Sequence, residues 1–188
     1  MTEELNSPET EKITFEEAEF TAAHVANYFL WRAWEEDMEI TPMKLLKLVY
    51  IAYGWNLVIN RQKLFNETIK AWEHGPVVPS LYHEYKNYGK NPIPKGNYDS
   101  EYEYDELSGE LKLNDIPIIE DKKITKVLSS VWKNYGQRDG IYLSKITHSP
   151  SSPWSQVYVK GKNNILRDND IVNRSLEGIR SLIEKANS

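Results

Sequence analysis

One almost wholly apolar helix constrains the fold of this sequence more than any other feature. Thr41 can cap its start, Pro42 suits the first helical position, and the segment MKLLKLVYIAYGWNLVI follows. The apolar side chains cover most of the helix circumference, and only Lys44 and Lys47 open a polar strip. A helix of this kind has to be covered by other elements, so we expect residues 42–59 to be the central helix.

Two residues of this helix carry more specific expectations. Gly54 lowers the helix propensity, which indicates that a neighbouring element packs closely against the helix at that position. Trp55 lies on the apolar surface of the helix, so we expect its side chain to be buried.

Helical periodicity and capping residues predict further helices on both sides of the central one. The expected helices, some of them short, cover residues 21–33, 80–88, 124–135, 139–146 and 169–183. Ser80 is the expected N-cap of the second of these, and Gly89 its stop signal. The sequence therefore predicts a mainly α fold, an all-α single domain of six or seven helices around residues 42–59.

Two segments have β character. The residues TIKAW, at positions 68–72, combine β-branched and aromatic side chains and predict a short strand. Residues 90–120 are rich in proline, glycine and acidic residues, and a hairpin is expected there around Ser108 and Gly109. We therefore allow for a small β element beside the helices.

Residues 1–20 differ in composition from the rest of the chain. Their sequence, MTEELNSPETEKITFEEAEF, is acidic and poor in apolar side chains, which is typical of a disordered tail. The part from Ile13 to Phe20 carries enough apolar side chains to dock on the body. We expect residues 21–188 to form one folded domain.

Composition narrows the functional classes. The 188 residues have a formal net charge of -5, no lysine or arginine run and no cysteine, which argues against direct DNA binding, disulfides and thiolate metal sites. No segment predicts a membrane span or a signal peptide, so we expect a cytoplasmic protein without membrane contact. Six tryptophans and twelve tyrosines suit packed surfaces and protein interfaces.

The sequence contains no motif that predicts catalysis, a cofactor or a metal. The four histidines are His24, His74, His83 and His148. They lack the spacing of zinc ligands, and no serine lies in a G-x-S-x-G motif. Serines follow His148 in a proline-rich turn, but catalytic triads assemble in space and cannot be inferred from neighbours in sequence. We expect no catalytic, cofactor-binding or metal-binding residues.

The stretch AWEHGPVVPSLYHEY, residues 71–85, is the most unusual corner of the sequence. Trp72 precedes the Gly75-Pro76 turn, and Trp154 similarly follows Pro153 in the segment SPSSPW. Both tryptophans are expected to anchor turns to the central helix.

Three motifs in this order resemble the Panacea-domain, SocA-like antitoxin family, which is also met as a family of phage-associated proteins. They are KLLKLVYIAYGWNL, AWEHGPVVP and LSKITHSPSSPW. The residues that match the family pattern are Lys44, Leu45, Leu46, Tyr50, Trp55, Ala71, Trp72, Gly75, Pro76, Val77, Pro79, Leu143, Thr147, His148, Pro153 and Trp154. Ile146 stands where the family usually has leucine, and the acidic residue that often follows the histidine is absent. The resemblance spans about residues 22–183.

The resemblance implies an antitoxin of a type II toxin–antitoxin system, which neutralises a cognate toxin by direct binding. The toxin is expected to be encoded by an adjacent gene, and the family has no associated catalytic residues or cofactors. One branch of the family resembles a proteolytic adaptor that hands its toxin to a protease, and this alternative stays open. A small enzyme that uses His74 or His148 is a further alternative, and a regulator that binds DNA ranks below these.

The candidate toxin-binding residues lie in the aromatic corner. They are Trp72, His74, Tyr82 and Tyr85. A turn followed by a short helix can present these side chains together, and aromatic anchors carry much of the binding energy in protein interfaces. Tyr85 is the weakest of the four because the same position can face the core.

Overall fold

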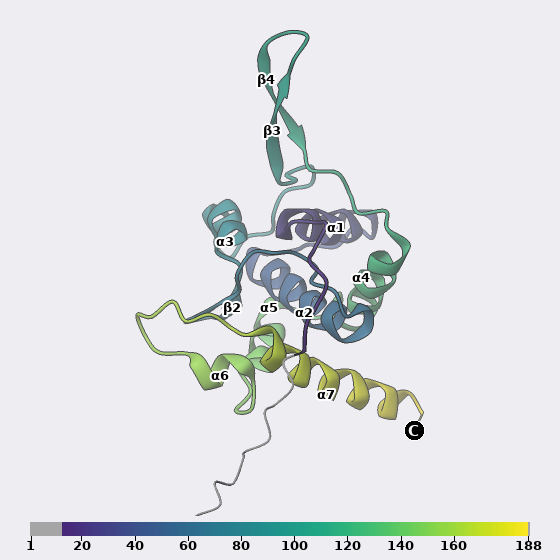
Figure 1. Cartoon of the computed structure of the whole chain (residues 1–188), viewed down its shortest axis with the longest axis vertical. Coiled ribbons are helices and arrows are strands. Elements are labelled where there is room, and N and C mark those ends of the chain that lie inside the picture. The colour runs from purple at the N-terminus through teal and green to yellow at the C-terminus, as the bar shows by residue number, and fades with distance from the viewer. Residues whose placement is uncertain (1–12, 188) are drawn as a thin grey trace, which may run out of the picture.

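The computed structural model describes residues 13–187. In this part of the chain the elements are α1 (Ala22–Glu35), α2 (Pro42–Asn60), β1 (Lys70–Trp72), β2 (Gly75–Val77), α3 (Pro79–Tyr85), the 3-10 helix η1 (Lys86–Tyr88), β3 (Ser100–Asp105), β4 (Glu110–Asp115), α4 (Lys122–Tyr135), α5 (Gly140–Thr147), α6 (Pro153–Val157) and α7 (Asp168–Ala186). The helices form one body, and the β3–β4 hairpin stands away from it (Figure 1).

Helix α2 occupies the centre of this body. It packs against α1, α4, α5 and α7, which approach it from different sides. Its first turn is capped as the sequence predicts, because the Thr41 hydroxyl accepts a hydrogen bond from the Lys44 backbone N–H at 3.4 Å. Leucine, valine and aromatic side chains from the surrounding helices complete the core around it.

At Gly54, α7 packs closely against α2. A Cβ atom at this position would lie 3.0 Å from Ile171 Cγ2 and would overlap the Ser175 hydroxyl. Both residues belong to α7. The expectation that a neighbouring element packs closely at Gly54 is therefore confirmed.

The expected polar strip on α2 is wrong, because Lys44 and Lys47 are both buried. The Lys44 ammonium lies 5.5 Å from the centroid of the Trp132 ring, over its face. The Lys47 ammonium donates a hydrogen bond to the Pro76 carbonyl oxygen at 2.9 Å. Each lysine reaches a polar or aromatic partner in a neighbouring element, so neither forms a solvent-exposed polar strip on α2.

The predicted all-α class is also wrong, because the described residues contain two antiparallel two-stranded sheets. Strand β1 pairs with β2, and Trp72 lies opposite Gly75. Strand β3 pairs with β4 around a turn in which Gly109 has a φ of +70°, a value that favours glycine. Each of the two turn-rich segments thus forms a two-stranded sheet of its own. The fold is therefore mixed α and β, although it is mainly helical.

Two short helices differ from the prediction, one in its start and the other in forming at all. Helix α3 begins at Pro79, with Val78 rather than Ser80 as its N-cap. Helix α6 forms in a segment that the sequence presents only as a turn, where the Ser152 hydroxyl accepts a hydrogen bond from the Ser155 backbone N–H. In both cases a proline fills the first helical position, which its fixed φ angle suits.

The described part of the predicted tail runs beside the loop that follows α2. The Glu16 backbone N–H donates to the Arg61 carbonyl oxygen at 3.1 Å, and the Lys63 N–H donates to the Glu16 carbonyl oxygen at 2.9 Å. Residues 1–12 lie outside the described residues, so the disordered tail stays a prediction. Among the helices of residues 13–187, none combines the length and the apolar character that a bilayer span requires.

Replacing Trp55 by alanine should destabilise the protein by about 3–5 kcal/mol. Trp55 is buried on α2, as expected, and its ring meets the Tyr135 ring edge-on at 6.0 Å between centroids. The substitution removes buried apolar surface and leaves a cavity. Urea unfolding followed by circular dichroism measures the free energy of unfolding.

Ile59→Ala is the matched control, because Ile59 lies on the same helix but its side chain is exposed. We expect this variant to stay within about 0.5 kcal/mol of the wild type. Equal losses in the two variants would contradict the central position of Trp55 in the core.

Candidate binding groove

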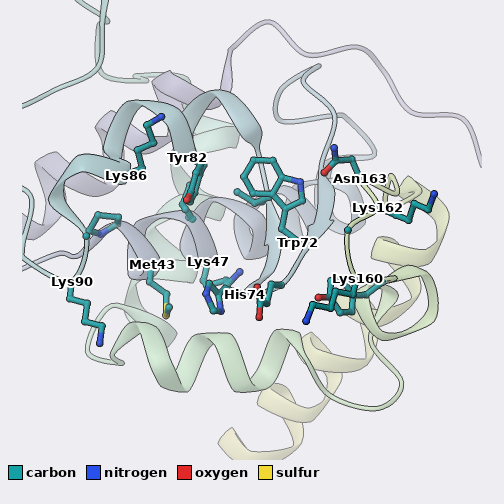
Figure 2. Close-up of a pocket in the computed structure, with 18 residues that line it drawn as sticks. Met43, Lys47, Trp72, His74, Tyr82, Lys86, Lys90, Lys160, Lys162 and Asn163 are labelled. Atoms are coloured by element: carbon teal, nitrogen blue, oxygen red, sulfur yellow. The ribbon is translucent and has the colours of Figure 1, made fainter.

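A groove of about 740 Å³ opens beside the β1–β2 turn. Helix α2, the turn, helix α3 and the loop of residues 158–163 supply its walls (Figure 2). Its apolar lining consists of Met43, Leu46, Trp72, Val77, Tyr82 and Tyr158. Five lysines also line it, namely Lys47, Lys86, Lys90, Lys160 and Lys162, whereas Glu73 is the acidic residue among its lining. The groove is therefore apolar and positively charged, in a chain whose net charge is negative.

The tight turn between β1 and β2 forms one wall of the groove. Gly75 begins β2 with a φ of +102°, a backbone conformation that favours glycine. Space is a second reason for glycine, since a Cβ atom there would lie 2.5 Å from Lys47 Nζ and 2.7 Å from His148 Cε1. The turn is thus held between α2 on one side and the end of α5 on the other.

Lys47 lies at the base of the groove with only 3% of its surface exposed. Its ammonium donates to the Pro76 carbonyl oxygen, and no Asp or Glu within residues 13–187 forms an ion pair with it. Burial disfavours the charged form and lowers the pKa of Lys47 to about 7. The hydrogen bond joins the central helix to β2 and so fixes the position of the turn.

The segment around Trp154 fastens the same turn from the other side. The Trp154 indole N–H donates to the Trp72 carbonyl oxygen at 2.7 Å, and the Trp154 ring stacks on Tyr158 with centroids 4.5 Å apart. The His148 ring lies against Trp154 at 4.1 Å, and its Nδ1 lies 2.6 Å from the Ser144 carbonyl oxygen. His148 Nε2 lies 3.4 Å from the Glu73 carbonyl oxygen. Both ring nitrogens thus face backbone carbonyls, which suits a positioning role.

The four candidate binding residues separate into two groups. Trp72, His74 and Tyr82 line the groove, and the Trp72 and Tyr82 rings meet edge-on at 5.0 Å. Tyr82 is 39% exposed, so its ring is accessible to a partner. Tyr85 is only 1% exposed and belongs to the core, because it lies one helical turn away from Leu81 on the buried face of α3. The expectation that Tyr85 joins the other three at a surface is wrong.

The residues that match the family motifs are mostly internal. The buried ones are Lys44, Leu45, Tyr50, Trp55, Ala71, Gly75, Pro76, Val77, Leu143, Thr147 and Pro153, and the half-buried ones are Leu46, Trp72, Pro79, His148 and Trp154. The three motifs lie far apart in the sequence, but α2 and the α5–α6 segment both contact the β1–β2 turn, which forms one wall of the groove.

The histidines of residues 13–187 do not assemble a metal site. No group of three histidine or carboxylate side chains within residues 13–187 could hold a metal ion. The hydroxyl nearest to His148 is Ser144, at 3.2 Å from Nδ1, whereas the Ser149 hydroxyl accepts a hydrogen bond from Arg174. The groove beside the β1–β2 turn is a surface suited to binding.

Sequence reasoning missed the lysines of the groove. Lys86 and Lys90 lie at one end, and Lys160 and Lys162 lie at the other (Figure 2). These two pairs are more than 60 positions apart in the chain, and neither forms a run of consecutive basic residues that would predict a charged site. Only the folded chain brings them to one opening.

Lys47 should make the stability of the protein depend on pH between about 7 and 10. In this range the unfolded chain keeps the lysine proton, whereas the folded chain has lost it. The free energy of unfolding of the wild type should therefore rise with pH relative to Lys47→Met, by up to about 1.4 kcal/mol per pH unit. Urea unfolding of both proteins at pH 7, 8 and 9 measures this difference.

The variant serves as its own control, because every other titrating group is common to both proteins. The hydrogen bond to Pro76 is lost at all pH values and adds only a constant offset. Parallel stability curves for the two proteins would show that the folded protein keeps Lys47 charged throughout this range.

Comparison with known proteins identifies the family. The family described as antitoxin SocA-like, Panacea domain matches residues 45–155, a segment that includes the β1–β2 turn and α3 beside the groove but not the loop of residues 158–163. The chain is 30% identical to the protein named antitoxin SocA of Caulobacter vibrioides (strain NA1000 / CB15N). The matched region of 136 residues covers 72% of this chain and 69% of that protein. No solved structure matches the chain. The protein therefore belongs to the SocA-like, Panacea-domain antitoxin family.

Proposed function

We propose that this protein is the antitoxin of a type II toxin–antitoxin system and neutralises a cognate protein toxin by binding it directly. Membership of the SocA-like family supports an antitoxin role. The single observation that carries direct binding is the groove, which combines an apolar lining with four exposed lysines at its two ends. The proposal involves no catalytic step and no cofactor.

The aromatic residues of the groove are suited to anchoring a protein partner. Trp72 and Tyr82 form an edge-on pair, and interface energy concentrates in such aromatic residues when a partner excludes water from them. The Trp72 indole N–H has no hydrogen-bond partner among the described residues. This nitrogen is itself buried, so Trp72 would contact a partner through its ring.

The lysines specify the chemistry of the segment that binds. With four exposed lysines and one glutamate in its lining, the groove favours an acidic segment with apolar side chains. The apolar side chains would contact Trp72 and Tyr82, and the carboxylates would meet the lysines at the two ends of the groove. We therefore propose that the toxin presents an acidic, partly apolar segment to this groove.

Replacing Tyr82 by alanine should weaken toxin binding by about 2 kcal/mol or more, which corresponds to a loss of affinity of about 30-fold. Tyr82 is partly exposed, so the fold should be retained. The partner to use is the product of the gene adjacent to this one. Isothermal titration calorimetry measures the affinity, growth under co-expression measures neutralisation, and circular dichroism checks the fold.

Tyr142→Ala is the matched control, because Tyr142 has a similar exposed fraction, 41%, and lies outside the groove lining. This variant should bind and restore growth like the wild type. If Tyr82→Ala also behaves like the wild type, the toxin binds elsewhere. If the wild-type protein neither binds its neighbour nor restores growth, the antitoxin proposal fails.

The co-expression experiment also distinguishes neutralisation by direct binding from delivery of the toxin to a protease. Direct neutralisation predicts that the toxin stays at a constant level while growth is restored. Rapid loss of the toxin in the presence of this protein, with growth restored, would favour the proteolytic adaptor instead.

A further inference from the structure

The β3–β4 hairpin carries an apolar face that no part of the described chain covers. Residues that lie opposite each other in an antiparallel pair share one face, as do alternate residues within a strand. Tyr102 lies opposite Leu113, and Tyr104 lies opposite Leu111, so these four side chains form one patch. Each of them is between 61% and 72% exposed. The hairpin projects from the helical body, and its patch stays open (Figure 1).

Such a patch indicates an interface. A two-stranded hairpin is marginally stable in water without further packing, and contiguous exposed apolar surface on a soluble protein usually marks a contact site. Leu107, in the turn of the hairpin, is fully exposed as well. The apolar surface of the hairpin is therefore best explained by a partner that covers it.

The body of the protein holds the hairpin at a defined place. Asn27 of α1 is fully buried, and its side-chain N–H groups donate to the carbonyl oxygens of Asp99 and Ile116, both at 2.9 Å. Its side-chain oxygen accepts from the Asp99 backbone N–H at 2.8 Å. One buried amide thus joins the two ends of the hairpin and fixes its base on α1.

The charges of the hairpin argue against contact between two hairpins. Between Ser100 and Asp115 the chain has six acidic residues and one lysine. Two such hairpins packed together would bring like charges close, which is unfavourable. A suitable partner has an apolar surface surrounded by positive charges.

The groove of this same protein has those properties. Its apolar lining includes Trp72 and Tyr82, and four exposed lysines accompany a single glutamate. No hairpin residue lines the groove within one chain, and the hairpin points away from the body. The complementary surfaces therefore cannot meet within one molecule in this structure, but they can meet between two.

We propose that the β3–β4 hairpin of one molecule docks in the groove of a second molecule, so that the protein associates with itself. The apolar patch of the hairpin covers the aromatic side chains of the groove. The strand carboxylates Glu101, Glu103 and Asp105 lie on the other face of the hairpin, so the groove lysines attract the hairpin through its overall negative charge. If each molecule inserts its hairpin into the other, the contact closes into a two-fold dimer. If the exchange is one-way, it extends into a chain of molecules.

Self-association would also regulate the groove, and this consequence rests on the proposed function. The hairpin of a neighbouring molecule has the acidic and apolar character that we propose for the toxin segment. The hairpin would then cover the groove in the free antitoxin, and the toxin would have to displace it.

Sedimentation velocity of the full chain tests the inference without any toxin. The average mass should rise with protein concentration at low salt, and the association should weaken at high salt because ions screen the charges. A protein that stays monomeric at every concentration in low salt would overturn the inference. The result does not depend on whether the antitoxin proposal holds.

Two variants should each abolish the association while keeping the fold. The first replaces Glu101–Asn114 by an Asn-Gly turn, which can join Ser100 to Asp115 because these residues are paired at the base of the hairpin. It leaves the contacts of Asn27 in place. The second carries Lys86→Glu and Lys90→Glu in the groove. If either variant associates as the wild type does, the inference is wrong.

Mixing the two variants gives the sharpest test. The first keeps an intact groove and the second keeps an intact hairpin, so the mixture should form a complex that neither variant forms alone. No complex in the mixture would contradict docking of the hairpin in the groove. The double change Tyr102→Ser and Tyr104→Ser in the otherwise intact chain should weaken association about 30-fold or more.

Matched controls separate these effects from general changes in charge or apolar surface. Lys122→Glu with Lys123→Glu makes the same change in net charge at exposed positions of α4. Ile141→Ser removes an apolar side chain that is exposed to a similar degree, outside the hairpin. Both controls should associate like the wild type. If the charge control loses association as fully as the groove variant, then net charge rather than the groove governs it.

Discussion

The need to bury the apolar surface of α2 determines the arrangement of the rest of the molecule. Apolar side chains cover most of the circumference of this helix, and four helices pack around it. Burial also constrains the two lysines of α2. Lys44 and Lys47 lie beneath neighbouring elements, so each ammonium needs a partner there: the Trp132 ring for the first and the Pro76 carbonyl for the second.

This constraint also explains why the groove lies where it does. The hydrogen bond from Lys47 ties the β1–β2 turn to the central helix, and Trp154 ties it to the α5–α6 segment. The turn is therefore a rigid element, although it lies at the surface. A rigid turn can hold Trp72 and Tyr82 in one arrangement before a partner arrives, which reduces the entropy that binding would cost. The family motifs form the wall that supports the groove, and the exposed lysines beside it set its charge.

The molecule has two surfaces of opposite character. The groove is apolar and positive, and the β3–β4 hairpin is apolar and negative. Asn27 fixes the hairpin on the body by hydrogen bonds to both of its ends, so this surface has a defined position as well. Two complementary surfaces that cannot meet within one molecule favour contact between molecules. If the groove is also the toxin-binding site, contact between antitoxin molecules and contact with the toxin exclude each other at that groove.

The sequence by itself determined the local structure. Periodicity and capping predicted most of the helices, the all-round apolar surface of α2 predicted the burial of Trp55, and Gly54 predicted a close neighbour. These inferences succeed because they depend on residues a few positions apart. Only the tertiary structure decided that Lys47 is buried, that Tyr85 faces the core, and that lysines from distant segments meet at one groove. It also decided that the turn-rich segments form two small sheets, which makes the fold mixed α and β. These properties depend on which segments meet in space, and long-range contacts of this kind leave no periodic signal in a single sequence.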